Sequence, residues 1–293
     1  MRYAILGTGL IGTSIGLALR QRLPKATVVG YDRVSAHARL ALRRKALTSV
    51  ASSMENAVAD AQVILIAVPR RQVVPLLARV LRAAPVGALV LDVAGLKSAI
   101  VAAGRRGQRT TRTAVFVGGH PMAGTERSGP GFARGDLFVG RTFALCVPIQ
   151  SRRSAAARHA EVFVRMLGAL PVQLSARDHD RVVAATSALP QVVASAVAAA
   201  AVDLAGKHTM LAGPGLDGVI RLAASPPALW AEDLIANKRN VLRALGVLQR
   251  TLHGFRQAIA AGDRMRLHRL LRAGASAQRR LSRRRQVFVS RTE

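Results

Sequence analysis

The chain has 293 residues and a formal net charge of +29, and half of its residues are apolar. This length exceeds the usual size of one domain, and the apolar content excludes a disordered chain. Such a charge would suit phosphate binding, but the basic residues are spread along the chain and only 3% of residues are aromatic. We interpret the charge as solvated helix faces that attract an anionic substrate, and we expect no nucleic-acid partner. One local cluster could contact a polyanion: Arg279, Arg280, Arg283, Arg284 and Arg285.

Cysteine content and hydropathy bear on the compartment. The single cysteine, Cys146, excludes an intramolecular disulfide, so the cytoplasm is the default location. Its apolar neighbours predict a buried strand residue rather than a reactive thiol. Asp203 interrupts the apolar run 192–204, so we expect no transmembrane helix and no membrane partner.

Short β-branched runs alternate with helical patterns through the first half of the chain, which is typical of a parallel α/β sheet. The predicted strands are residues 3–6, 27–31, 63–68, 89–93 and 114–117. A further pair of strands, 143–147 and 172–174, is predicted on either side of a helix at 154–167.

The first predicted strand runs directly into a glycine-rich turn from which a helical pattern starts. This is the context of the dinucleotide-binding fingerprint, where Gly7 permits the tight turn and Gly9 lets the backbone approach the pyrophosphate. Gly12 allows close packing of helix on strand, and the helix N-terminus supplies N–H donors. The predicted cofactor-binding residues of this turn are Gly7, Thr8, Gly9, Leu10, Ile11 and Gly12.

The second predicted strand ends beside Asp32, about 20 residues after the last fingerprint glycine, where an acid binds the ribose. A carboxylate there repels a 2′-phosphate and therefore indicates NAD, although the adjacent Arg33 leaves room for NADP. Val68 and Pro69 after the third strand, and Asp92 at the end of the fourth, are expected beside the nicotinamide half of the crevice. No metal site is predicted.

His120 follows the strand at 114–117 and lies in the loop 118–131, which holds five glycines and two prolines. A histidine is the side chain most easily tuned to accept a proton near neutral pH, so His120 is the candidate base. With the reference pKa, activity should rise with pH through about 6–7. The other six histidines are interpreted as structural: His37, His159, His179, His208, His253 and His268.

After residue 175 the pattern becomes helical, with long stretches at 180–204, 226–260 and 263–281. Only 287–289 resembles a strand. We therefore predict an N-terminal Rossmann dinucleotide-binding domain, 1–176, and an all-α C-terminal domain, 177–293. These helices are too apolar for a solitary satellite domain, above all over 192–204, so we expect a homodimer whose C-terminal domains interlock.

Several segments, in sequence order, resemble one enzyme family. Residues 92–97 (Asp-Val-Ala-Gly-Leu-Lys), 118–126 (Gly-Gly-His-Pro-Met-Ala-Gly-Thr-Glu), 128–129 and 136–138 are similar to active-site turns of prephenate/arogenate dehydrogenases. His179-Asp180 with residues 187–191 resembles the first long C-terminal helix of that family. The resemblance spans residues 2–250 and includes a further series: Arg221, Leu222, Ala223, Trp230, Asn237, Lys238 and Asn240.

The resemblance implies an NAD-dependent oxidative decarboxylation of prephenate or arogenate in tyrosine biosynthesis. His120 then accepts the proton of the ring hydroxyl, and Arg221 holds a substrate carboxylate with its bidentate guanidinium. Lys97 is a further candidate, because the chain otherwise uses arginine almost throughout. The implied substrate-binding residues are Arg221, Gly95, Lys97, Ser128 and Gln191.

Two positions depart from the usual pattern of the family. Gly95 replaces a serine that commonly hydrogen-bonds the catalytic histidine, so we expect the loop backbone or Ser128 to orient His120. Ala188 and Gln191 replace two histidines of the helix motif. These changes leave open whether prephenate, arogenate or both are used, and whether tyrosine inhibits.

Two other functions compete with this interpretation. A different Rossmann reductase with a helical dimer domain, of β-hydroxyacid or pyrroline-carboxylate type, would account for the fingerprint and the helices. It would not account for His120 in its loop or for Arg221, Trp230 and Asn237 in series. A non-catalytic, polyanion-binding Rossmann protein is favoured by charge alone.

Overall fold

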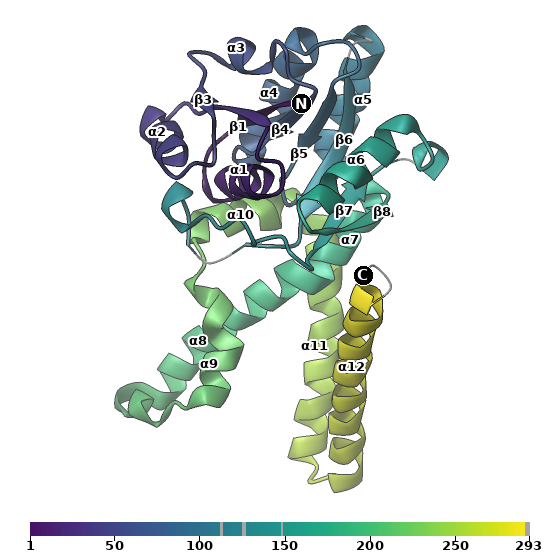
Figure 1. The fold of residues 1–293 in the computed structure, drawn as a ribbon. Helices are drawn as coiled ribbons and strands as arrows, with labels where there is room; N and C mark the ends of the chain where they lie inside the picture. Colours follow the sequence, from purple (N-terminus) through teal and green to yellow (C-terminus); the bar gives the residue numbers. More distant parts are fainter. Residues whose placement is uncertain (112–113, 125–126, 148, 291–293) are drawn as a thin grey trace. The chain divides into compact units, whose positions relative to one another are not determined.

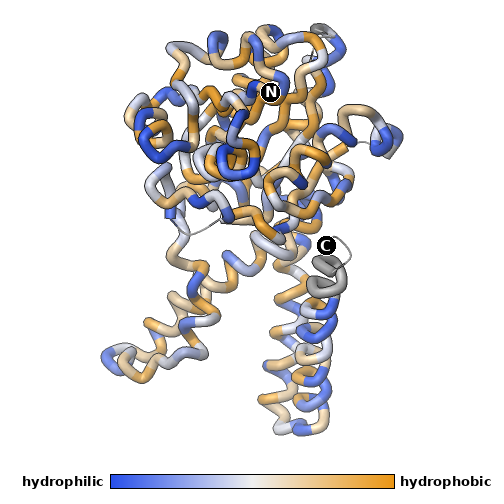
Figure 2. Tube along the Cα trace, viewed as in Figure 1, coloured by the Kyte–Doolittle hydropathy of each residue, from blue (hydrophilic) through white to orange (hydrophobic). Residues whose placement is uncertain are grey.

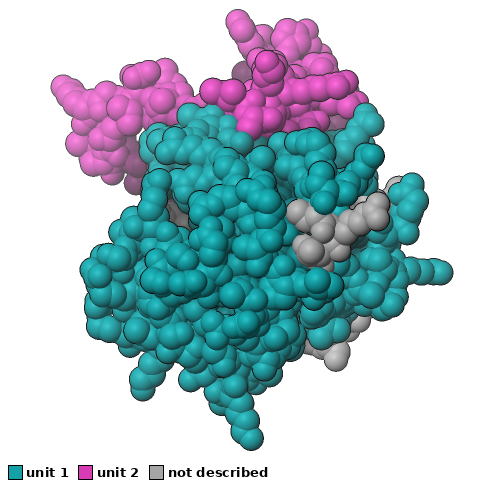
Figure 3. Space-filling view, turned by 90° about the horizontal axis from the view of Figure 1, so that it is seen from above, with its two compact units in different colours: residues 1–182, 224–233 teal, residues 183–223, 234–293 magenta. Residues whose placement is uncertain are grey.

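The computed structural model describes residues 1–111, 114–124, 127–147 and 149–290. The chain divides into two compact units, coloured separately in Figure 3. Unit 1 comprises Met1–Val182 and Ala224–Asp233, and unit 2 comprises Val183–Ala223 and Leu234–Glu293. Each unit has its own internal contacts and is described by itself.

Unit 1 is built on an eight-stranded sheet in the order β3-β2-β1-β4-β5-β6-β7-β8. The order reverses between β1 and β4, which is the doubly wound arrangement of a dinucleotide-binding sheet. All neighbouring strands are parallel except β6 and β7. The strands are β1 (Arg2–Leu6), β2 (Thr27–Tyr31), β3 (Ser49–Val50), β4 (Val63–Ile66), β5 (Leu89–Asp92), β6 (Val115–Pro121), β7 (Thr142–Cys146) and β8 (Leu170–Leu174).

Helices cover both faces of this sheet, as Figure 1 shows. Alternate residues of β1 enter two separate cores, Tyr3 and Ile5 on one face, Ala4 and Leu6 on the other. The first core includes side chains of α1 (Leu10–Arg22) and α6 (Ala155–Met166). The second includes side chains of α3 (Met54–Val58), α4 (Arg70–Ala83) and α5 (Ser98–Thr111). α2 (Ser35–Arg43) follows β2. The predicted Rossmann architecture is confirmed.

β6 is longer than the sequence predicts. Its first part pairs in parallel with β5, and its last four residues pair antiparallel with β7, with His120 opposite Ala144. His120 is thus part of a strand rather than a loop, which corrects the expectation. Gly118 and Gly119 make this possible, because a side chain at 119 would collide with the carbonyl oxygen of Asp92.

Unit 2 consists of helices. Its elements are a π-helical turn (Ala184–Ala188), α8 (Leu189–Ala205), α9 (Pro214–Ile220), α11 (Lys238–Ala260) and α12 (Arg264–Ser290). α11 packs along α12 and also touches α8. α12 includes residues 287–289, which were expected to form a strand. In Figure 2 apolar colour runs along α8 and α11. Large apolar side chains there are exposed, for example Leu204 and Leu242.

The compact units divide slightly later than the predicted boundary at residue 176. α7 (Ala176–Val183) belongs almost wholly to unit 1, because its Asp180 accepts hydrogen bonds from the backbone N–H groups of Lys97 and Ser98. The segment Ala224–Asp233, which contains most of α10 (Pro227–Ala236), also groups with unit 1.

The helical segment Ala176–Leu211 is long and apolar enough to cross a membrane by length and composition, contrary to the expectation for this region. Asp203 lies outside the most apolar part of the helix, so it does not interrupt that stretch. However, His179 and Asp180 at the start of the segment are buried in unit 1. The segment is therefore tied to a folded α/β unit at its N-terminal end.

Candidate active site

The glycine-rich turn after β1 has the geometry that a dinucleotide requires. Gly7 adopts a φ of +93°, and a side chain there would collide with the carbonyl oxygen of Ala67. A side chain at Gly12 would collide with the carbonyl oxygen of Gly7, whereas one at Gly9 would meet nothing within 4 Å. No side chain caps the N-terminus of α1, so its N–H groups are available to a phosphate. The residues present therefore fit a dinucleotide.

Asp32 lies directly beside this turn. Its Oδ2 accepts hydrogen bonds from the backbone N and from Oγ1 of Thr8, at 2.6 and 3.0 Å, and its Oδ1 accepts one from Val34 N at 2.8 Å. The carboxylate is thereby held at the end of β2, the position expected of the ribose contact. Arg33 is exposed. At the end of β4, Val68 is partly exposed and Pro69 forms the N-cap of α4.

His120 belongs to a buried hydrogen-bond relay. Its Nδ1 lies 2.9 Å from Nε2 of His179, and Nδ1 of His179 lies 2.9 Å from Oδ1 of Asp180. A carboxylate can only accept, so His179 donates from Nδ1 and keeps a lone pair on Nε2. His120 must then donate from its own Nδ1. The relay therefore assigns the free lone pair of His120 to Nε2, the atom required of a base.

Asp180 anchors the relay. Both of its oxygens accept backbone hydrogen bonds at the start of α5, Oδ1 from Lys97 N and Oδ2 from Ser98 N, each at 2.8 Å. Burial alone would raise the pKa of Asp180, but the hydrogen bonds from His179, Ser98 and Lys97 lower it below its ordinary value. The carboxylate is thus ionised and fixed, which in turn fixes the tautomer of His179.

A second buried pair lies beneath the strand that carries His120. Lys97 and Asp92 are both fully buried; Nζ of Lys97 is ion-paired with Asp92 and also donates to the carbonyl oxygen of Gly119 at 2.6 Å. Asp92 accepts from Gly119 N at 3.2 Å as well. Sequence alone did not predict that these two candidate site residues are buried against each other. The pair supports the backbone directly before His120.

The surroundings of His120 keep its imidazole neutral. Burial, then the neighbouring His179 and Lys97, lower the pKa of His120 well below 6.5, and Asp180 only partly opposes them. The expectation of a pKa near the reference value is therefore too high. A base in this environment is unprotonated at neutral pH. It becomes positively charged only when a proton is transferred to Nε2.

Several predicted site residues lie outside this network. Ser128 is exposed and no hydrogen bond to its side chain is seen in the described part of the chain, so His179 rather than Ser128 orients His120. Arg221 is exposed, and Gln191 is buried in α8; both belong to unit 2. The Oε1 atom of Gln191 is buried and has no partner among the described residues. Thr125 and Glu126 of the family-like motif lie outside the described residues.

His179 is the functional residue that sequence reasoning misjudged, because it was grouped with the structural histidines. The signal was present in its neighbour. A His-Asp pair at the start of a helix, directly after the last strand of the sheet, brings an imidazole and its orienting carboxylate to the carboxyl edge where His120 lies.

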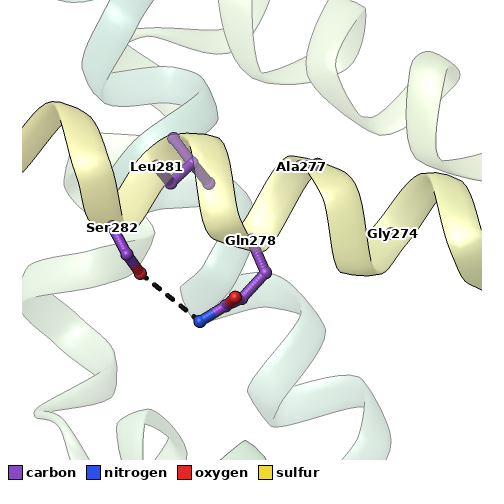
Figure 4. Close-up of a pocket in the computed structure, with 5 residues that line it drawn as sticks. All are labelled: Gly274, Ala277, Gln278, Leu281 and Ser282. Atoms are coloured by element: carbon purple, nitrogen blue, oxygen red, sulfur yellow. Dashed lines mark hydrogen bonds between the residues drawn. The ribbon is translucent and has the colours of Figure 1, made fainter.

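A hollow of about 430 Å³ lies along α12, lined by Gly274, Ala277, Gln278, Leu281 and Ser282 (Figure 4). All five residues come from one helix, and none of them is ionisable. Its only hydrogen bond among the lining side chains joins Gln278 to Ser282 at 3.3 Å. The hollow therefore offers no catalytic group and resembles a helix-packing surface instead.

Comparisons with known proteins point to one family across most of the chain. Residues 15–170 match the family described as prephenate dehydrogenase, nucleotide-binding domain. Residues 175–273 match prephenate dehydrogenase, dimerization domain. The first match begins within α1 and contains the strand with His120, and the second contains His179 and Arg221.

Individual relatives agree with these matches. The chain is 34% identical over 268 residues to a probable prephenate dehydrogenase, NovF, of Streptomyces niveus, covering 90% of this chain and 71% of that protein. It is 29% identical over 242 residues to prephenate dehydrogenase of Bacillus subtilis, covering 81% of this chain and 64% of the relative, which is longer. The crystal structure of Synechocystis arogenate dehydrogenase matches with a TM-score of 0.82 at 26% identity, covering 96% of this chain and all of that one.

Proposed function

Because the chain belongs to the prephenate dehydrogenase family, we propose that it catalyses the NAD-dependent oxidative decarboxylation of prephenate or arogenate. The observation that carries this proposal is the free Nε2 acceptor of His120, which the relay through His179 and Asp180 orients. The histidine lies at the carboxyl edge of the sheet, the same edge as the glycine-rich turn. A neutral base there can take a proton from a substrate bound near the nicotinamide.

The proposed chemistry uses both protonation states of His120. Nε2 accepts the proton of the ring hydroxyl while the carbon that bears the hydroxyl loses a hydride. Bound NAD supplies the hydride acceptor. Loss of the ring carboxylate as carbon dioxide makes the ring aromatic, and the imidazolium returns its proton to the phenolate oxygen. Throughout these steps the relay keeps Nδ1 protonated, so only Nε2 exchanges a proton.

We propose NAD rather than NADP as the cofactor. Asp32 is held beside the turn by Thr8 and Val34, so its charge cannot easily move away from a ribose 2′ position. Arg33, the residue after Asp32, is exposed and offers a cation that could pair with a 2′-phosphate.

We propose substrate contacts for three residues, each argued from its own surroundings. Arg221 is exposed and free to pair with a carboxylate of the substrate, and a guanidinium does so bidentately. Gln191 has a buried Oε1 without a partner in the described part of the chain, which costs free energy unless a ligand donates to it. Gly95 leaves open space in front of His120 Nε2. Lys97 and Asp92 are proposed to act indirectly, by supporting Gly119.

We propose that the protein is a homodimer joined through unit 2. Unit 2 matches the family's dimerization domain for most of its length. Large apolar side chains are exposed on α8, on the segment that follows it and on α11, including Val202, Leu204, Met210, Leu211, Leu242 and Leu252. An interlocked partner would remove this surface from water.

The same surface bears on location and on other partners. The apolar segment Ala176–Leu211 begins with His179 and Asp180 buried in unit 1. If a second copy covers the rest, its apolar side chains are removed from water without lipid. We therefore propose a cytoplasmic enzyme without a membrane partner. The basic residues are proposed to attract anionic substrates rather than nucleic acid.

The test is turnover with both substrates and both cofactors, followed as absorbance of the reduced nicotinamide. We expect reduction of NAD with prephenate, arogenate or both, and slower reduction of NADP. Absence of turnover with either substrate would overturn the proposal. A gel shift of duplex DNA at physiological salt, in an enzyme without turnover, would instead favour the polyanion-binding alternative.

A further inference from the structure

Gly95 opens a small space that is faced by two ionisable groups. A Cβ atom built on Gly95 would lie 3.5 Å from Oδ2 of Asp233, 3.9 Å from Nε2 of His120 and 4.0 Å from its Cε1. All three residues belong to unit 1. The free lone pair of His120 and a carboxylate oxygen of α10 thus face the same point. A larger residue at 95 would fill the space that lies between them.

Arg70 holds Asp233 in this position. Nε of Arg70 donates to Oδ1 of Asp233 at 2.6 Å, and its Nη2 donates to the carbonyl oxygen of Glu232 at 3.1 Å. The side chains are 23% and 24% exposed, so water screens the pair only partly. Among residues 1–111, 114–124, 127–147 and 149–290, Oδ2 of Asp233 accepts no hydrogen bond. The clamp therefore uses one carboxylate oxygen and leaves the other directed toward Gly95.

We propose that Asp233 is a positioning residue for the reaction: held by Arg70, it stabilises the imidazolium that forms when Nε2 of His120 takes the substrate proton. The proposal rests on the proposed function of His120 as base. On the Nδ1 side His120 meets His179, and Lys97 lies close behind its strand. Burial disfavours a positive ring, so a negative group on the Nε2 side offsets that cost as the charge develops.

The charged and titratable groups around His120 come from each neighbouring element. The end of β5 contributes Asp92 and the turn after it contributes Lys97, and these two groups neutralise each other. α7 contributes His179 and Asp180, and α10 contributes Asp233 with its partner Arg70 from α4. Two carboxylates, Asp180 and Asp233, are not paired with Lys97. Asp180 already accepts hydrogen bonds from His179 and from the backbone at the start of α5. Oδ2 of Asp233 lies near the same point beside Gly95 as the reacting nitrogen.

The test measures the pKa of His120 directly, by NMR titration of its Cε1–H signal in the full-length enzyme without substrate. The signal is assigned by its loss in His120→Asn. We expect Asp233→Asn to lower this pKa by about half to one unit and to reduce kcat about 3- to 10-fold, with Asp233→Glu restoring most of both. Arg70→Met leaves the carboxylate charged but unneutralised, so it should raise the pKa.

The neighbouring ion pair Arg71–Glu232, at 3.4 Å, joins the same two helices and provides the control. Like Arg70→Met, Arg71→Gln removes one ion pair between α4 and α10, but it should leave the pKa of His120 unchanged. If the pKa of His120 in Asp233→Asn equals the wild-type value, the Arg70–Asp233 ion pair is purely structural. The same conclusion follows if Asp233→Asn and Arg70→Met shift this pKa in the same direction. Because the titration needs no substrate, an enzyme inactive on prephenate and arogenate but with the expected shifts would refute the proposed function alone.

Discussion

Unit 1 encloses the charged groups of its site, whereas unit 2 leaves large apolar side chains on its surface. Lys97 and Asp92 are fully buried and paired, and His179 and Asp180 are buried in one relay. In unit 2, by contrast, Leu204 is 89% exposed. The hydrogen bonds of the unit 1 site are thus made within one chain, while the apolar surface of unit 2 is the one that we propose a second copy covers.

The largest effect is expected from His120→Asn. Asparagine keeps the size and some hydrogen bonding but cannot accept the proton, so kcat should fall about 10²- to 10⁴-fold while NAD and substrate still bind. In the wild type, activity should rise with pH through a value well below 6.5, because burial, His179 and Lys97 lower the pKa of His120. Near wild-type kcat in the variant, measured across pH, would remove His120 from the mechanism.

His179→Leu tests the relay itself. Leucine removes the acceptor for His120 Nδ1–H, so the imidazole loses its fixed tautomer and orientation, and kcat should fall about 10- to 100-fold. His179→Gln retains an acceptor and should recover part of the loss. His159, on α6, is a matched histidine away from the relay, and His159→Gln should change kcat little. Equal effects at 159 and 179 would contradict the relay.

Arg221→Gln tests whether Arg221 binds the substrate. Loss of a charge-assisted contact to a substrate carboxylate costs about 1.5–3 kcal/mol, so KM for the substrate should rise by about 10- to 100-fold with little change in NAD affinity. Initial rates at varied substrate measure this. An unchanged KM would place Arg221 outside the pocket.

Leu204→Asp tests whether the exposed apolar surface of unit 2 forms a dimer interface. Burial of a leucine contributes about 1.5–3 kcal/mol, so a buried aspartate at each copy should weaken dimerisation at least tenfold. Light scattering across a concentration series should then detect monomer. Val86→Asp, at an 83% exposed site of unit 1, is the control and should leave the mass unchanged. A wild type that is a stable monomer at micromolar concentration would exclude the homodimer.

The smallest effect is expected from Asp32→Ser, which should narrow or reverse the preference for NAD by about tenfold, since it removes one repulsive charge from the ribose site. The ratio of kcat/KM values for NAD and NADP measures it. The variant should leave the pH profile unaltered, because Asp32 takes no part in the relay. A wild-type preference for NADP would show that Asp32 does not bind the ribose.

Much of the nucleotide site follows from local sequence. The tight turn at Gly7, the open space at Gly9 and the close helix contact at Gly12 each depend on a missing side chain within a few residues of the chain. His120 could be chosen from seven histidines for a similar reason, since the glycines before it and its position after a strand are local signals.

The partners of His120 were decided by the tertiary structure. His179 is 59 residues away and Asp233 lies on α10, and no local pattern states that either faces the same imidazole. For Lys97, sequence shows the charge but not its burial against Asp92. The sequence by itself determined the turn, the candidate base and the alternation of strands and helices, since these depend on neighbours along the chain. Only the fold decided the charges and hydrogen bonds around that base, because electrostatic contacts depend on distance in space.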